Sequence, residues 1–320
     1  MSDILRLIFP FFGMLLIGYA TGRWHKLAGA ALPGLTFFVN NLAMPALFFT
    51  VVASAPSGEK AIWPFVLTTT FSTYCVFAIA FSLGAIVNGG QVREATIQGL
   101  IGSYSNIALL APGIALAAFG PGAGLPMALV FCFDNALIFA TVPLMMMLGG
   151  TGHSEPRVLV EQVARGALLH PLVIATILGL IARGTGAALP EAVDALLAML
   201  AAAGAPAALF TVGIGLAIPT PARVAAETPV LIGIKLIVHP LIVYLLLSWV
   251  GDFDPVWVHT AILIAALPPA MGLVSFAREQ KAYVEGASLA VVFATVISIA
   301  TITVVAILLV KDVLPVDPFR

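Results

Sequence analysis

The chain has 320 residues, of which 61% are hydrophobic and only 9% are charged, and its formal net charge is −1. Because soluble domains carry about 25% charged residues, most of this chain must lie in a membrane, and the near-zero net charge points to no nucleic-acid partner. The two cysteines, Cys75 and Cys132, lie within apolar runs, which indicates reduced core residues rather than a disulfide framework or a metal site.

Ten charge-poor segments follow one another along the chain, and each is about 20 residues long, enough to cross the hydrocarbon as a helix. They cover residues 4–22, 32–53, 63–87, 95–119, 125–148, 160–182, 192–218, 229–250, 257–277 and 286–310. The first lacks a basic leader and a small-residue cleavage site, so we expect a retained span rather than a signal peptide. The sequence therefore predicts an all-α integral membrane protein with ten transmembrane helices.

The lysines and arginines of the loops and span ends divide unequally between the two sides of such a bundle. One side holds eight of them: Arg23, Lys26, Arg93, Arg157, Arg165, Arg223, Arg278 and Lys281. The other side, with both termini, holds five: Arg6, Lys60, Arg183, Lys311 and Arg320. Because cytoplasmic loops carry the excess of Lys and Arg, this bias favours both termini outside the cytoplasm.

The two halves of the chain, 1–150 and 151–320, resemble each other. Ala43–Val51 in the second span is similar to Ala205–Val212 in the seventh, and Ala128–Phe131 in the fifth span is similar to Ala290–Phe293 in the tenth. Each half holds five spans, an odd number, so the second half must enter the membrane with opposite orientation. We therefore expect two inverted five-helix repeats, a common organisation of secondary transporters.

The symmetry pairs the fourth span with the ninth, and both contain proline. The fourth span carries Pro112 after a polar cluster of four residues: Ser103, Tyr104, Ser105 and Asn106. The ninth span carries Pro268 and Pro269. Proline frees carbonyl groups that lipid cannot satisfy, so breaks at this depth usually line a substrate cavity, and the adjoining helix N-termini attract anions. The alternative is that the polar side chains only satisfy the kinked backbone or hold helices together.

Asp134 and Asn135 lie near the middle of the fifth span. An intramembrane carboxylate is costly and is a functional candidate by default, so Asp134 is a candidate for proton or ion coupling. Its alternatives are a structural hydrogen bond and an ion pair with Lys235. Asn135 is neutral and can donate to a substrate carboxylate.

Lys235 and His239 lie four residues apart on one face of the eighth span. Lys235 could extend to the membrane surface, provide a fixed positive charge near an anion, or replace a coupling sodium ion. His239 precedes Pro240 and could only cap a kink. Asn41, in the second span, could bind substrate or pack against another helix.

Three glycines, Gly99, Gly102 and Gly113, are expected to permit close helix crossings. The chain contains no Gly-Lys-Ser/Thr phosphate loop, no His-Glu-x-x-His metal motif and no Gly-x-Ser-x-Gly nucleophile elbow. We therefore expect neither an enzyme nor a cofactor or metal.

With those residues in view, the chain resembles the auxin efflux carrier family, whose bacterial members include permeases for malonate and other organic acids. The resemblance covers nearly the whole chain and depends on four segments in order: Ile8–Tyr19, Asn40–Phe48, Ser105–Gly113 and Leu267–Ala270. Asn106, Pro112, Pro268 and Pro269 match the family's substrate-side positions, whereas Asp134 and Lys235 match no family motif.

The resemblance implies a fold similar to that of sodium/proton antiporters and bile-acid symporters, in which broken helices 4 and 9 cross. Spans 1, 2, 6 and 7 would form a scaffold through which a homodimer assembles, and spans 3–5 and 8–10 a moving transport domain. It also implies a multi-pass protein of the bacterial inner membrane, with periplasmic termini if the charge bias holds.

The sequence thus predicts an elevator-type secondary transporter of a small organic anion, a mono- or dicarboxylate such as malonate or an auxin-like acid. The expected substrate-contacting residues share the breaks and the polar cluster of spans 2, 4, 5 and 9: Asn41, Ser103, Ser105, Asn106, Pro112, Asn135, Pro268 and Pro269. The alternatives are a cation/proton antiporter and a sodium-coupled organic-anion symporter of the same architecture.

Overall fold

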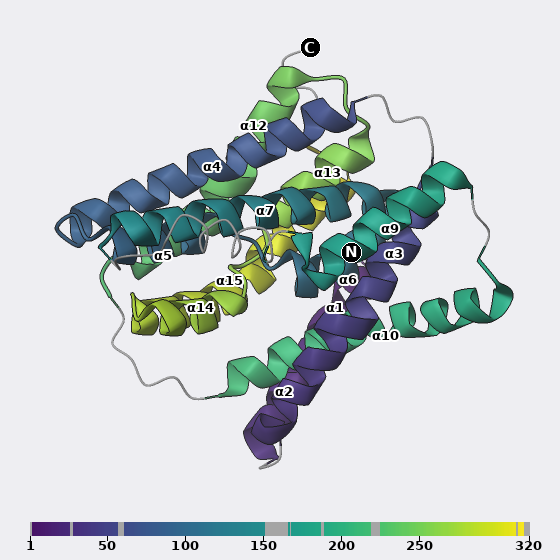
Figure 1. Cartoon of the computed structure of the whole chain (residues 1–320), viewed down its shortest axis with the longest axis horizontal. Coiled ribbons are helices and arrows are strands. Elements are labelled where there is room, and N and C mark those ends of the chain that lie inside the picture. Colours follow the sequence, from purple (N-terminus) through teal and green to yellow (C-terminus); the bar gives the residue numbers. More distant parts are fainter. Residues whose placement is uncertain are drawn as a thin grey trace. The chain divides into compact units, whose positions relative to one another are not determined.

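The computed structural model describes residues 2–25, 28–56, 61–150, 166, 168–186, 189–218, 225–311 and 313–316. Within these ranges the regular structure is helical, and an isolated β-bridge pairs Ser105 with Pro269 (Figure 1). Six of the basic residues used for the topology prediction lie outside the described residues: Lys26, Lys60, Arg157, Arg165, Arg223 and Arg320.

Six of the described helices are long and apolar enough to cross a membrane. They are Gly29–Ala53, Ile62–Val87, Pro121–Leu148, Glu191–Ala217, Thr228–Val250 and Val284–Val310. Shorter apolar helices cover Ile107–Phe119, Pro171–Thr185 and Pro255–Ala265. Each of the ten predicted spans overlaps a helix, although most of 160–170, at the start of the predicted sixth span, lies outside the described residues.

The chain divides into two compact units. The first comprises 1–60, 107–132 and 170–219. Its helices are α1 (Ser2–Trp24), α2 (Ala28–Phe38), η1 (Val39–Ala43), α3 (Met44–Ala53), α6 (Ile107–Phe119), η2 (Pro121–Ala123), the start of α7 (Gly124–Leu148), α9 (Pro171–Thr185) and α10 (Glu191–Ala217). Here α1 packs closely on α10. The contact leaves no room for a side chain at Gly213, since a Cβ atom there would lie 2.2 Å from the carbonyl oxygen of Leu15.

The second unit comprises 61–106, 133–169 and 220–320, so the division falls inside α7, between Cys132 and Phe133. Besides the rest of α7, its helices are α4 (Ile62–Val87), α5 (Val92–Ser103), α11 (Thr228–Gly233), η3 (Ile234–Val238), α12 (His239–Val250), α13 (Pro255–Ala265), α14 (Gly272–Gln280) and α15 (Val284–Val310). This unit contains the residues that form the candidate site below.

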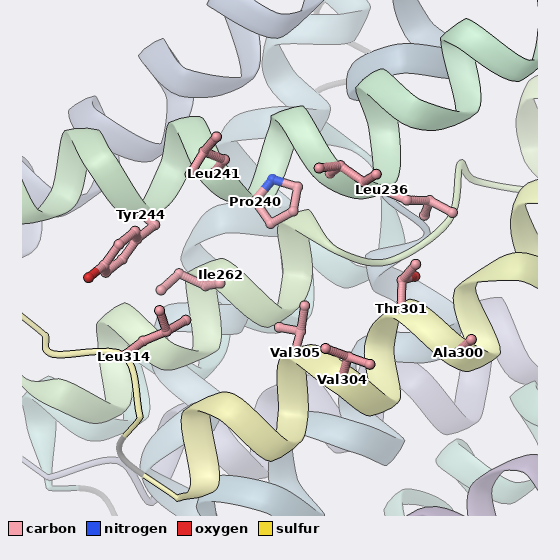
Figure 2. Close-up of a pocket in the computed structure, with 11 residues that line it drawn as sticks. Leu236, Pro240, Leu241, Tyr244, Ile262, Ala300, Thr301, Val304, Val305 and Leu314 are labelled. Atoms are coloured by element: carbon pink, nitrogen blue, oxygen red, sulfur yellow. The ribbon is translucent and has the colours of Figure 1, made fainter.

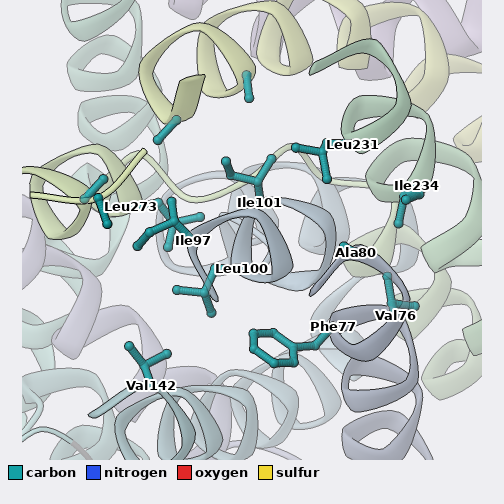
Figure 3. Close-up of a cluster of buried hydrophobic side chains, with 14 of the residues drawn as sticks. Val76, Phe77, Ala80, Ile97, Leu100, Ile101, Val142, Leu231, Ile234 and Leu273 are labelled. Carbon is teal, nitrogen blue, oxygen red and sulfur yellow. The ribbon is translucent and has the colours of Figure 1, made fainter. Parts of the chain in front are cut away.

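The core of the second unit gathers buried apolar side chains from α4, α5, α7, α11, η3, α14 and α15 (Figure 3). At its centre α5 packs on α4. A Cβ atom on Gly102 would lie 2.4 Å from the Cβ of Ala80, and one on Gly99 would lie 2.7 Å from the ring of Phe77. The prediction of a close helix crossing is confirmed for Gly99 and Gly102, and this crossing holds the end of α5 in place.

Two π-helical turns, η1 and η3, are each followed by a proline. Met44 donates its backbone N–H to the carbonyl of Val39, and His239 donates to that of Ile234, five residues back in both cases. The next residues, Pro45 and Pro240, have no N–H to donate. The wider turn accommodates each proline without ending the helix.

The break in the predicted fourth span does not lie at the proline, contrary to the sequence analysis. The helix stops after Ser103, Tyr104 is extended, and α6 begins at Ile107. Pro112 lies inside α6 and is buried in the first unit. The interruption therefore coincides with the polar cluster itself, because Tyr104 and Asn106 form backbone hydrogen bonds with the other broken segment.

Candidate functional site

Two helix breaks meet within the second unit. The backbone N–H of Asn106 donates to the carbonyl oxygen of Pro268 at 2.9 Å, and that of Ala270 donates to the carbonyl of Tyr104 at 3.2 Å. These bonds flank the antiparallel bridge between Ser105 and Pro269. Each break thus satisfies backbone groups of the other, which lipid could not do.

The carbonyl of Ala265, the last residue of α13, has no donor from its own helix. In an α-helix the carbonyl of Ala265 would accept from residue 269, but a proline there has no N–H. The Nζ atom of Lys235 lies 2.6 Å from this oxygen and donates to it. A lysine from η3 therefore replaces the missing backbone donor.

Lys235 is fully buried, with 0% of its surface exposed. Besides Ala265, its Nζ contacts the hydroxyl oxygen of Ser105 at 2.9 Å and Nδ1 of His239 at 3.0 Å. An ammonium has three protons, so these three neutral acceptors use all of them, with the His239 proton then on Nε2. The alternative in which Lys235 extends to the membrane surface is wrong.

Asp134 is buried in α7, with 2% of its surface exposed. Its Oδ2 accepts from the hydroxyl of Thr73 at 3.3 Å, and its Oδ1 has no hydrogen-bond partner among the described residues. No hydrogen bond or close ion pair joins Asp134 to Lys235 within the described part of the chain, so the two charges interact only through space. The carboxylate therefore keeps one free acceptor.

Two buried amide groups keep free donors. The Oδ1 of Asn135 accepts from the hydroxyl of Tyr104 at 3.1 Å, and its Nδ2 has no partner in the described ranges. The Nδ2 of Asn106 is likewise unpaired among the described residues. Buried polar groups are almost always hydrogen-bonded, so free amides at one helix break indicate a place for a ligand that accepts hydrogen bonds.

Most of the predicted site residues lie in this second unit, in or near the breaks. Those that make the contacts above are Ser105, Asn106, Asp134, Asn135, Lys235, His239, Pro268 and Pro269. Ser103 donates to the carbonyl of Gly99 at 2.9 Å and so satisfies its own helix. Asn41 and Pro112 belong to the first unit, where the amide of Asn41 donates to the carbonyl of Phe37 at 3.0 Å.

Sequence reasoning missed the roles of Thr73 and Tyr104. Tyr104 connects the first break to Asn135, and Thr73 connects α4 to Asp134. A signal for Thr73 was present, because the third span carries a run of hydroxyl side chains over 68–74.

A second polar network lies at one end of the same unit. Asn88 donates to Oε1 of Gln98 at 2.7 Å, and Gln98 donates to Oε1 of Glu227 at 3.0 Å. The hydroxyl of Tyr283 donates to the same Glu227 oxygen at 2.8 Å. Burial raises the pKa of Tyr283 to about 12, which keeps the hydroxyl protonated. The network ties the starts of α11 and α15 to α5.

An apolar cavity of about 440 Å³ also lies in the second unit, between α12, α13 and α15 (Figure 2). Its lining includes Leu236, Pro240, Ile262, Val304 and Leu314, and among the described residues no charged side chain takes part. It therefore does not suit a carboxylate. Among the described residues, no group of three or more His, Cys, Asp or Glu could hold a metal ion.

Comparison with known proteins identifies the type of protein. Residues 3–306 match the family described as "Membrane transport protein". The chain belongs to this family, the auxin efflux carrier family. This carrier is also 39% identical, over 319 residues and the whole of both chains, to a Rhizobium meliloti (strain 1021) protein named "Putative malonate transporter". The resemblance inferred from the sequence is confirmed.

Family membership also settles the class of function. The carrier is a multi-pass membrane transport protein rather than an enzyme.

Proposed function

We propose that this carrier is a secondary transporter of a small organic anion, a mono- or dicarboxylate such as malonate or an auxin-like acid. The name of the Rhizobium meliloti relative, which assigns malonate to that protein, supports this substrate class. The chemistry of the helix breaks supports it independently.

The observation that carries the proposal is the pair of free amide donors on Asn106 and Asn135. An ionised carboxylate only accepts hydrogen bonds and has room for several donors. The two amides lie close to the same break, because Asn106 is part of it and Asn135 is bonded to Tyr104. They would bind one carboxylate group of the substrate, with Ser105, Pro268 and Pro269 shaping the break around it.

For the movement, we propose an elevator mechanism in the inner membrane, with periplasmic termini and a homodimer formed through the scaffold. Two inverted repeats, 1–150 and 151–320, would supply a scaffold from spans 1, 2, 6 and 7 and a transport domain from spans 3–5 and 8–10. The contents of the two units support this, since the first holds α1, α3, α9 and α10 and the second α4 and α11–α15. The fourth and fifth spans are divided between the units.

A second candidate, a cation/proton antiporter, is favoured by one observation, the free Oδ1 of Asp134. A single carboxylate offers less oxygen-rich charge than a cation site usually has. The anion transporter is the better-supported function because both free amides are donors.

Three variants of one residue separate these candidates. Asn106→Ala removes one donor to a charged group, so we expect the apparent affinity for malonate to fall about ten- to hundredfold in proteoliposome uptake. Asn106→Asp keeps the shape but adds a negative charge, so it should lower anion uptake further than Ala does. Asn106→Gln, which keeps the amide, should retain more uptake than either.

The folding control is thermal unfolding of each purified variant in detergent. Uptake by a well-folded Asn106→Ala protein at the wild-type level would remove Asn106 from the site. Cation binding improved by Asn106→Asp, without any carboxylate uptake by the wild type, would favour the antiporter.

A further inference from the structure

The ammonium group of Lys235 lies where a helix end would bind a cation. The carbonyl end of α13 carries the negative end of an 11-residue helix dipole. In broken-helix transporters, unwound carbonyls and half-helix C-terminal ends bind the coupling Na⁺. Here the freed carbonyl of Ala265 and the hydroxyl of Ser105 lie 2.6 and 2.9 Å from the Lys235 Nζ instead.

We propose that Lys235 is a built-in substitute for a coupling cation, and that it makes transport by this carrier independent of Na⁺. The proposal deepens the proposed function, because it names the source of positive charge at the break that would bind the carboxylate. An alkali ion and an ammonium would share the two oxygen ligands here, those of Ala265 and Ser105, whereas the third acceptor of the ammonium is a nitrogen of His239.

The hydrogen bonds of Lys235 assign it a positioning role rather than direct contact with substrate. All three protons are used by Ser105, Ala265 and His239, so none is left for a carboxylate. Two of these acceptors belong to different breaks, since Ser105 lies in the first and Ala265 ends the helix before the second. Lys235 thus joins the breaks, as a shared cation would.

The surrounding charges fit the same role. Asp134 is the acidic group that acts on Lys235 through space, and it is not hydrogen-bonded to it. A bound cation in the place of the Nζ would use Asp134 as a counter-charge in the same way. The positive group also adjoins the free amide of Asn106, because Ser105 is the preceding residue.

The test compares the wild type with Lys235→Ala and Lys235→Met in proteoliposomes, with malonate uptake measured in sodium and in choline salts of equal ionic strength. Wild-type uptake should be the same in both salts. Lys235→Ala leaves the Ala265 carbonyl and a space for an ion, so its uptake in choline should fall at least about tenfold, as expected for losing hydrogen bonds from a charged group. Sodium or ammonium ions should restore part of it. Lys235→Met fills the space and should not respond.

A second readout does not depend on the substrate. The Tm of Lys235→Ala in detergent should rise with Na⁺ or NH₄⁺ because an ion bound to the folded state stabilises it. The Tm values of the wild type and of Lys235→Met should not rise with either ion. The matched control is Lys311→Ala, which removes an exposed lysine at the end of α15 and should behave as the wild type in both assays.

The outcomes separate the two proposals. The proposal that Lys235 replaces a coupling cation is overturned if Na⁺ specifically raises either malonate uptake by the wild type or its Tm. It is also overturned if Lys235→Ala takes up malonate in choline at the wild-type rate. If Lys235→Ala does not fold, the wild-type comparison of the two salts decides alone. The wild type and all variants could fail to take up malonate in every salt while the Tm of Lys235→Ala still rises with Na⁺ or NH₄⁺. That result would support Lys235 as the substitute for a cation and would reject only malonate as the substrate.

Discussion

The Nζ atom of Lys235 lies 2.6 Å from the carbonyl oxygen of Ala265, an oxygen in the last turn of α13 whose helical donor position, residue 269, is a proline. A gap in the hydrogen bonding of α13 is thus filled by a buried side chain from η3. This relationship joins three features that the sequence presents separately, namely a proline pair, an intramembrane lysine and a hydroxyl on the fourth span.

Replacing Pro269 with alanine should weaken this connection. Pro269→Ala restores an N–H four residues after Ala265, and where α13 then extends to residue 269 that N–H takes the Ala265 oxygen, the shortest acceptor, from Lys235. A buried charged donor left without a partner costs roughly 1–3 kcal/mol or more, and we expect a lower Tm and slower malonate uptake. Pro255→Ala, at the first turn of α13 where an N–H needs no helical partner, is the matched control and should change uptake little. Wild-type uptake by Pro269→Ala would contradict the assigned role of Lys235.

The close crossing of α4 and α5 can be tested with two glycines in the same unit. Gly102→Ala places a Cβ 2.4 Å from that of Ala80, whereas a Cβ on Gly233 would have no atom within 4 Å. Overpacking costs about 1–3 kcal/mol, which exceeds the gain of about 0.5–1 kcal/mol from helix propensity. Gly102→Ala should therefore lower the Tm, and Gly233→Ala should leave it equal or raise it. Equal Tm changes in the two variants would show that α4 and α5 can separate easily.

The network at Glu227 should contribute to stability through Tyr283. Tyr283→Phe loses a hydrogen bond to a carboxylate, which is worth about 1.5–3 kcal/mol when buried and less at this partly exposed end. The control is Tyr74→Phe, since the hydroxyl of the exposed Tyr74 is bonded to the neutral hydroxyl of Thr141 at 2.9 Å. Because the pKa of Tyr283 is raised to about 12 by burial, its stabilising effect is full below about pH 10, the unfolded value, and is lost as the pH rises toward 12. Between these pH values the Tm of the wild type should therefore fall further than the Tm of Tyr283→Phe. An equal fall of Tm with pH in both proteins would contradict the stabilising role of the network.

Much of the fold was readable from the sequence, for a physical reason. Lipid forces spanning segments to be long, apolar and helical, so helices overlap each predicted span and six have the length and composition to cross. The place of the break in the fourth span was not readable. Pro112 is accommodated inside α6, while Tyr104 and Asn106 leave the helix because their backbone groups bond to Pro268 and Ala270, far along the chain.

The candidate site was predictable in its members but not in its connections. Asn106, Asp134, Asn135 and Lys235 stand out in sequence because polar groups are rare in apolar spans. Whether Lys235 extends to the surface or inward depends on its acceptors Ser105 and Ala265, which lie 130 and 30 positions away along the chain. Local sequence patterns carry no information about such long-range partners, which is also why Thr73 was missed.

The proposed orientation of the membrane spans can be tested with cysteine labelling. In a background with Cys75 and Cys132 replaced by serine, single cysteines are placed after Met1 and beside Pro318. Because the count of Lys and Arg favours both termini outside the cytoplasm, both should react with an impermeant thiol reagent in intact cells. A cysteine beside Arg93, on the side proposed to be cytoplasmic, should react only after lysis. The opposite pattern of labelling would reverse the orientation.

The role of Asp134 separates an anion transporter from a cation exchanger. Asp134→Asn keeps the shape and can still accept from Thr73, so we expect the variant to fold. The assay is malonate uptake into proteoliposomes together with proton flux driven by a Na⁺ or K⁺ gradient in the absence of any organic anion. Wild-type protein should take up malonate and should show no cation-driven proton flux without it.

Thr73→Val is the matched control, because it removes the hydrogen bond to Asp134 but leaves the carboxylate in place. If Asp134 carries a coupling proton, Asp134→Asn should lose the dependence of malonate uptake on a pH gradient, while Thr73→Val should retain it with a shifted pH profile. If the carboxylate is structural, both variants should retain that dependence and differ from the wild type mainly in Tm. Cation-driven proton flux by the wild type without malonate, lost in Asp134→Asn, would overturn the anion transporter, because only a carboxylate that binds protons and cations in turn gives that result.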